Sequence, residues 1–124
     1  MDFKNFTIKA QEAIQKAQQL AQEYGHQQIE NEHIFKAITE IDKNVTPFLL
    51  KKLNVNTNLF NQLLDKNLES FAKVEGGDIV LSREAGKTLN EANIIAKKMN
   101  DDYVSIEHLI LAIFKSKSKI AQGL

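Results

Sequence analysis

The chain contains no cysteine, which excludes a disulfide framework and thiolate chemistry. It also lacks an excess of either charge, because Lys and Arg number 16 and Asp and Glu number 16. A protein held to nucleic acid by its phosphates normally shows a basic excess, so we expect no nucleic-acid partner. No apolar run approaches bilayer-spanning length, and Met1–Lys4 does not open a signal peptide. We therefore expect a cytoplasmic protein without a membrane partner.

Motifs for catalysis and for cofactor binding are missing as well. Gly86-Lys87-Thr88 resembles the end of a phosphate-binding loop, but Leu81 occupies the place of its first glycine, and the triplet lies in a predicted helix. The three histidines form no His-Glu-x-x-His motif, and no serine sits in a strand–turn–helix elbow. We predict a non-enzymatic domain with no metal or cofactor of its own, whose helix-start histidines pack or hydrogen-bond locally.

What the sequence does contain is an internal repeat. Displaced by 75 positions, Phe6–Ile38 aligns with Leu81–Ile113 without a gap. Each copy must form the same substructure, so a site built from one copy can occur twice. The clearest part of the match is a doubled step, Glu32-His33-Ile34 and Glu107-His108-Leu109. Alanines and an isoleucine are also repeated: Ala10, Ala17, Ala21, Ala37 and Ile38 match Ala85, Ala92, Ala96, Ala112 and Ile113.

The spacing of apolar residues predicts an all-α fold, helical nearly throughout, in one domain over residues 1–124. The first repeat takes residues 6–71 and four helices. Side chains that can cap a helix, and a glycine that can end one, mark the boundaries. We expect Thr7 as the first N-cap, Gly25 as the first stop, a second helix from about Asn31, Thr46 as an N-cap followed by Pro47, and Asn56 as the fourth N-cap.

A linker over residues 72–81 contains Gly76-Gly77 and leads into the second repeat, residues 82–124. Ser82 is expected to cap a fifth helix whose buried face includes Met99. A sixth helix is expected to begin near Ser105.

The second repeat is incomplete in this sequence. Leu124 corresponds to Leu49, so the counterpart of the fourth helix is absent at the C-terminal end. Either the sequence is a truncated piece or the repeat is naturally short. We expect truncation, because the chain stops inside an apolar pattern.

Glu32 and Glu107 stand in the first turn of their helices. A carboxylate there stabilises the helix dipole by roughly 0.3–1 kcal/mol, which is a sufficient structural reason for either residue. A helix start also offers free backbone N–H groups to an anion, while the carboxylate can take a cation. A site with both could hold a polar peptide group, and both interpretations stay open.

Ile94 and Ile95 interrupt the symmetry of the repeat, because the first copy has Gln19 and Leu20 there. Ile95 can reach the core face, whereas Ile94 lies off it. Ile94 is therefore either a contact for a partner or one of the single exposed apolar residues that are common on proteins.

Several motifs together resemble the amino-terminal repeat domain of Clp/Hsp100 proteins. In the first copy they are Phe6-Thr7-x-x-Ala10, Gly25-His26 and Glu32-His33-Ile34, and in the second Leu81-Ser82-x-Glu84-Ala85 and Glu107-His108-Leu109. Thr46-Pro47-Phe48-Leu49-Leu50 and Val74-x-Gly76-Gly77 are most similar to the ClpB branch of disaggregases. The resemblance covers almost the whole chain. It implies two four-helix repeats related by pseudo-twofold symmetry.

This resemblance implies a function. Domains of the family sit on a flexible linker above hexameric ATPase rings, bind unfolded or aggregated polypeptide or adaptor proteins, and have no ATPase activity themselves. ATP and Mg²⁺ are then expected only in ATPase domains outside this sequence. The resemblance also implies roles for Thr7, Asp101 and Glu107 in substrate handling.

In the related ClpC branch, glutamates equivalent to Glu32 and Glu107 recognise phosphoarginine. Asn31 and Ile106 depart from the threonine usual beside them, and Ile106 has no hydroxyl to offer a phosphate.

We therefore predict a substrate-recruiting domain of a ClpB-like disaggregase, with a peptide groove beside the fifth and sixth helices. Ile94, Ile95, Asp101 and Glu107 would contribute to it. The alternatives are an adaptor- or phosphoarginine-docking domain of a ClpC/ClpA-type protease unfoldase, or a helical DNA-binding module, which the zero net charge disfavours.

Overall fold

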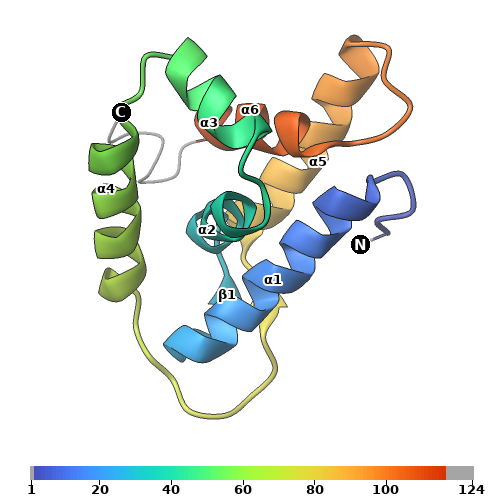
Figure 1. Cartoon of the computed structure of the whole chain (residues 1–124). Coiled ribbons are helices and arrows are strands. Elements are labelled where there is room, and N and C mark those ends of the chain that lie inside the picture. Colours follow the sequence, from blue (N-terminus) through green and yellow to red (C-terminus); the bar gives the residue numbers. More distant parts are fainter. Residues whose placement is uncertain (1, 117–124) are drawn as a thin grey trace.

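The computed structural model describes residues 2–116 and contains six helices and two very short strands. The all-α prediction is confirmed, and the strands were not predicted. Figure 1 shows α2 at the centre, with α1 and α5 to one side and α4 to the other. In chain order the elements are α1 (Ile8–Tyr24), β1 (Gln28–Ile29), α2 (Asn31–Ile41), α3 (Val45–Lys52), α4 (Thr57–Ser70), β2 (Val80–Leu81), α5 (Arg83–Lys98) and α6 (Ile106–Lys115).

The first helix of each copy starts with the same kind of cap. The Thr7 hydroxyl accepts a hydrogen bond from the Ala10 N–H at 3.1 Å, and the Ser82 hydroxyl accepts one from the Ala85 N–H at 3.0 Å. Both predicted N-caps are confirmed, and each satisfies a backbone donor that the helix leaves free.

The same helices also end alike. Gly25 follows α1 in the left-handed conformation with φ of 75°, as predicted. Asn100, its repeat equivalent after α5, has φ of 59°. Asparagine tolerates that conformation better than most residues, so α5 ends in the same way as α1 although it has no glycine there.

Short parallel pairings tie the two copies to each other. β1 pairs with β2 in parallel, and at the repeat-equivalent place Phe6 forms a parallel bridge with Val104. The Ser82 N–H donates to the Ile29 carbonyl at 3.0 Å, and the Thr7 N–H donates to the Val104 carbonyl at 2.9 Å. The segment that leads into each copy therefore pairs with the middle of the other copy, which is the arrangement expected of a pseudo-twofold axis.

The core lies where α2 and α6 meet the alanine-lined faces of α1 and α5. The repeated alanines are fully buried or nearly so, which allows close approach of the helix backbones. An aromatic cluster then fixes α4: Phe60 lies 4.8 Å from Phe35 of α2 and 5.8 Å from Phe114 of α6, measured between ring centroids.

The start of α3 differs from the prediction. The helix begins at Val45, so Thr46 lies inside its first turn and is not the N-cap. Asp42 does the capping instead, because its carboxylate accepts the Thr46 N–H at 2.6 Å and the Thr46 hydroxyl at 2.8 Å. Burial by itself raises the pKa of Asp42, but these hydrogen bonds outweigh burial and lower it.

Met99 is also misplaced by the prediction. It is 49% exposed and sits at the C-cap of α5, beyond the last turn that faces the core. Helical periodicity carries no information once the helix has ended, which is why the residue was assigned to the buried face.

Candidate functional site on the second repeat

The doubled Glu-His step turns out to be a capping arrangement. The Glu30 N–H donates to Nδ1 of His33 at 2.8 Å, and the Ser105 N–H donates to Nδ1 of His108 at the same distance. In each copy a histidine at the third helical position takes the place of the usual Glu or Gln of a capping box. The prediction that these histidines bond locally is confirmed.

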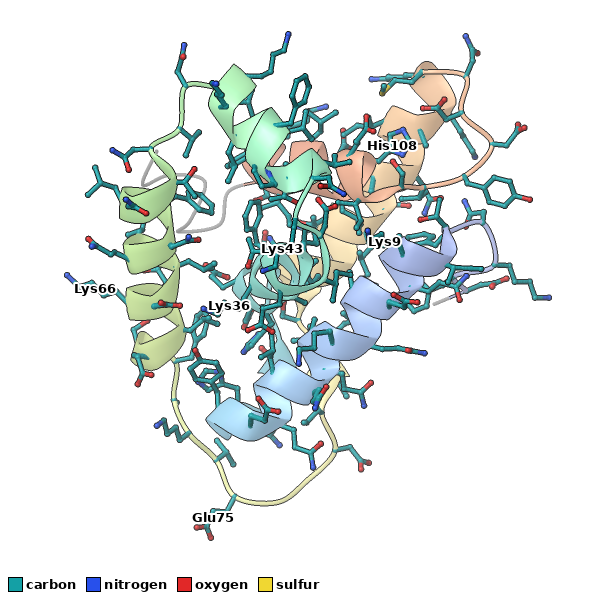
Figure 2. The ribbon with its side chains drawn as sticks, viewed as in Figure 1. Lys9, Lys36, Lys43, Lys66, Glu75 and His108 are labelled. Atoms are coloured by element: carbon teal, nitrogen blue, oxygen red, sulfur yellow. The ribbon has the colours of Figure 1, made fainter. Side chains whose placement is uncertain are left out.

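The other ring nitrogen of each histidine contacts a residue seven positions earlier. Nε2 of His108 lies 2.8 Å from Oδ2 of Asp101, and Nε2 of His33 lies 2.8 Å from Nδ1 of His26. Because a backbone N–H already donates to Nδ1, the hydrogen of each neutral ring must be on Nε2. His26 and Asp101 are repeat equivalents, so at the same position an imidazole accepts the hydrogen bond in the first copy and a carboxylate accepts it in the second. Figure 2 shows His108 beside α5.

Asp101 was predicted to contact substrate. One of its oxygens accepts the His108 hydrogen bond, while the side chain remains 46% exposed. It therefore combines a structural bond with a carboxylate that solvent can still reach.

The two repeated glutamates have different surroundings. Glu32 is 3% exposed, so it offers no carboxylate to a ligand at the surface. Glu107 is exposed and lines a depression of about 320 Å³ with residues of α3. The carboxylate site is thus not duplicated, although its sequence motif is. The depression is lined by Asn44, Val45, Phe48, Leu49 and Glu107.

Ile94 and Ile95 divide as the sequence predicts. Ile94 is 37% exposed, whereas Ile95 is partly buried and packs against the core. Two further apolar residues of the second copy are exposed, Met99 at 49% and Tyr103 at 58%. We call Ile94, Met99 and Tyr103 the second-repeat apolar residues. Tyr103 was missed, although comparison with its repeat equivalent, Gln28, would have indicated it.

Thr7 lies next to this region, although it belongs to the first copy. Its hydroxyl caps α1, and its backbone N–H bonds the carbonyl of Val104, the neighbour of Tyr103. The Asn5 amide likewise donates to Oδ1 of Asn93, the neighbour of Ile94, at 2.5 Å. The start of the chain therefore borders the second-repeat apolar residues.

A groove does run between α5 and α6, but not through the predicted residues. It is a depression of about 420 Å³ with both charged and apolar walls, and it is spanned by an ion pair of 2.6 Å between Lys115 and Glu91. Ile94, Ile95, Asp101 and Glu107 do not line it. Its walls are Glu84, Lys87, Thr88, Glu91, Ala112, Lys115 and Ser116.

Over residues 2–116, no group of three or more His, Cys, Asp or Glu side chains could hold a metal ion. Over the same described residues, no helix combines the length and the apolarity needed to cross a bilayer.

Comparison with known proteins gives the chain its relatives. It is 43% identical over 121 residues to the chaperone protein ClpB of Bacteroides thetaiotaomicron, and 38% identical over 117 residues to that of Porphyromonas gingivalis. These matches cover 98% and 94% of this chain, but each spans only 14% of the relative.

Solved structures show the same fold. The Hsp104 N-terminal domain from Candida albicans superposes with a TM-score of 0.85 at 24% identity, covering 97% of this chain and 81% of that one. The N-terminal domain of the Escherichia coli ClpV1 ATPase gives 0.81 at 18%, covering 91% and 69%. The sequence profile described as "Clp repeat (R) N-terminal domain" matches residues 5–124. The chain belongs to the Clp repeat N-terminal domain family.

Proposed function

We propose that this chain is the non-catalytic, substrate-recruiting N-terminal domain of a ClpB-like, ATP-dependent disaggregase, and that it binds unfolded or aggregated polypeptide. Its ClpB relatives support the chaperone class. Because the chain spans only 14% of those relatives, the ATPase rings and the hexamer belong to the rest of such a protein.

One observation carries the proposed binding role. At two positions the second copy exposes an apolar side chain where the first copy has a polar one. Ile94 and Tyr103 correspond to Gln19 and Gln28 in the first copy. The first copy forms the same fold with glutamine at the equivalent positions, so the fold itself does not require an apolar side chain there. Unfolded chains differ from folded ones chiefly in exposed apolar groups, which such residues can contact.

Binding at this surface should be weak and unselective. A fully buried aliphatic side chain contributes about 1.5–3 kcal/mol, and the neighbouring Lys97, Lys98 and Asp101 supply polar contacts without a shaped pocket. Weak affinity suits a domain tethered to a larger machine, because the tether raises the local concentration of any captured chain.

The test is an NMR titration of the domain with a permanently unfolded model protein, following the backbone amides. We expect shifts around Ile94, Tyr103 and Asp101, and we expect Ile94→Ser to weaken binding by about five-fold or more. Gln19→Ser is the matched control, since it changes the repeat-equivalent position on the first copy. Equal affinity for the wild type and Ile94→Ser would place the binding surface elsewhere.

The same titration distinguishes the proposed function from the alternative, an adaptor- or phosphoarginine-docking domain. A phosphoarginine peptide that gives saturable shifts at Glu107 and the α3 depression, with no response to the unfolded protein, would favour an adaptor- or phosphoarginine-docking domain. The burial of Glu32 predicts at most one such site per domain.

A further inference from the structure

The His26–His33 pair lies where three segments meet. His26 is 4% exposed and His33 is fully buried. Tyr24, the last residue of α1, stacks on His26 with ring centroids 5.3 Å apart. Phe71, the first residue after α4, packs edge-on against His26 at 5.5 Å and lies 6.0 Å from His33. The pair therefore joins the end of α1, the start of α2 and the segment that follows α4.

The hydrogen bonds of this pair leave no room for another proton. His33 accepts the Glu30 N–H at Nδ1, so it donates from Nε2 to Nδ1 of His26. A proton added to Nδ1 of His33 would face the Glu30 N–H. A proton added to Nδ1 of His26 would face the Nε2 hydrogen of His33. Protonation of either ring therefore breaks a 2.8 Å hydrogen bond and places a charge among buried rings.

The remaining ring nitrogen adds to this instability. His26 must carry its hydrogen on Nε2, and that atom is buried with no partner among the described residues. A buried donor without a partner destabilises the closed arrangement. Opening of the contact would let this N–H bond to water, so the closed arrangement leaves one hydrogen-bond donor unsatisfied that the open arrangement would satisfy.

Charged groups around the pair do not reverse this preference. Burial first, and the neighbouring His26 second, together lower the pKa of His33 to about 4. Burial also lowers the pKa of His26, as does Lys73, against the opposing influence of Glu69 and Glu30. Tyr24 stays neutral, because burial raises the pKa of its hydroxyl.

We propose that the His26–His33 pair is an acid-sensitive latch, which holds the start of α2 and residues 71–80 against the end of α1 and releases them on protonation. The segment is otherwise held lightly. Its N–H groups at Val74 and Val80 donate to Gly25 and Gln27, at 2.8 and 3.2 Å. Figure 2 shows Glu75 at its tip, away from the helices.

Release would enlarge a depression of about 540 Å³ that already separates this segment from residues 26–30. It would also expose Phe71, which stands beside the already exposed Val74 and Val80. The second copy differs, because acceptors stand at both ring nitrogens of His108. The Asp101 carboxylate lies 2.8 Å from Nε2 and the Ser105 hydroxyl lies 3.1 Å from Nδ1, so an added proton finds a partner there.

The direction of the pH effect follows from the geometry. A histidine whose folded pKa lies below its unfolded value of about 6.5 stabilises the fold fully above that value. The stabilisation is lost as the pH falls from about 6.5 towards 4. For His33 alone, the opening equilibrium should shift by roughly 50-fold between pH 7 and 4.5.

The test is amide hydrogen exchange of the whole chain, with protection corrected for the intrinsic effect of pH. The Glu30 amide, bonded to His33, should lose roughly 50-fold protection between pH 7 and 4.5, relative to the Ala85 amide, whose acceptor is the Ser82 hydroxyl and does not titrate. Nitrogen-15 spectra of the imidazoles should show both rings protonated at Nε2 at pH 7. Parallel loss of protection at Glu30 and Ala85 would overturn the proposal.

Variants separate the latch from general acid sensitivity. His33→Gln restores the usual capping-box residue, whose carbonyl can accept the Glu30 N–H without titrating. It should abolish the selective acid response, while the matched change His108→Gln should leave that response intact. If His33→Gln does not fold, His26→Gln is the second variant. It removes one of the two titrating rings and should reduce the response without abolishing it, because His33 still titrates. An unchanged response in the folded variant would refute the latch.

Discussion

The two repeats share a backbone plan and differ in the side chains that complete it. Each copy caps its second helix with a histidine, but the partner of that histidine is His26 in one copy and Asp101 in the other. The hydrogen bond is 2.8 Å long in both copies, but the charge of the partner side chain differs, and so does the effect of adding a proton. A repeat thus conserves bonds more closely than the residues that form them.

An ion pair shows the same behaviour with its signs exchanged. Lys16 of α1 pairs with Glu40 of α2 at 3.7 Å, and at the equivalent place Glu91 of α5 pairs with Lys115 of α6 at 2.6 Å. What the two copies preserve is the opposition of charge between their two main helices.

The largest effect that tests the equivalence of the two copies is expected in the core. Ile38 of α2 and Ile113 of α6 correspond in the repeat, and both are fully buried. Ile38→Ala and Ile113→Ala should each lower the free energy of unfolding by about 3 kcal/mol, through lost burial and the cavity left behind. Urea denaturation measures this, with the exposed Ile8→Ala as control. A loss under about 1 kcal/mol at either site would show that the copies are not equally packed.

A smaller effect is expected at the two N-caps. Thr7→Ala and Ser82→Ala should each cost about 1 kcal/mol, because each removes the acceptor for a backbone N–H of the first turn. Thermal unfolding gives the comparison.

Thr7→Ser sharpens that test, since serine keeps the cap. If Thr7→Ala weakens polypeptide binding and Thr7→Ser does not, the effect on binding follows from the helix start. Loss of binding in both would assign the threonine methyl a direct contact, as the predicted substrate role requires.

The smallest effect belongs to the exchanged ion pair. Lys16→Glu alone should destabilise the domain by roughly 0.5 kcal/mol, because it opposes Glu40 with a like charge. The double change Lys16→Glu with Glu40→Lys copies the second repeat and should restore wild-type stability. Stability measured at low and high salt checks the origin of the effect, since an electrostatic loss shrinks as salt is added. A double variant no more stable than the single one would contradict the equivalence.

Prediction from sequence succeeded where a single local rule decides the outcome. Thr7, Ser82 and Gly25 each satisfy a helix end through their own side chain or backbone, so their roles can be read without knowing the fold. The core followed from helical spacing for the same reason, up to the last turn, where Met99 was assigned wrongly.

The parts that escaped prediction depend on distant contacts. Strands of two residues have no periodicity, so β1 and β2 could not be seen in the sequence. Thr46 has the side chain of an N-cap, but Asp42 precedes it and takes that task. The burial of Glu32 and the exposure of Glu107 arise from packing around identical tripeptide positions, which no local pattern distinguishes.

The crossed pairing of the two copies has a consequence for the order in which the chain can fold. Phe6 finds its partner at Val104, almost the full described length away, and β1 waits for β2. On the ribosome, the first copy can form α1 to α4 early, but its leading segment stays unpaired until residue 104 has emerged. Closure of the domain is therefore a late, long-range event, and the segment near Phe6 is the part of the first copy that waits longest for its partner.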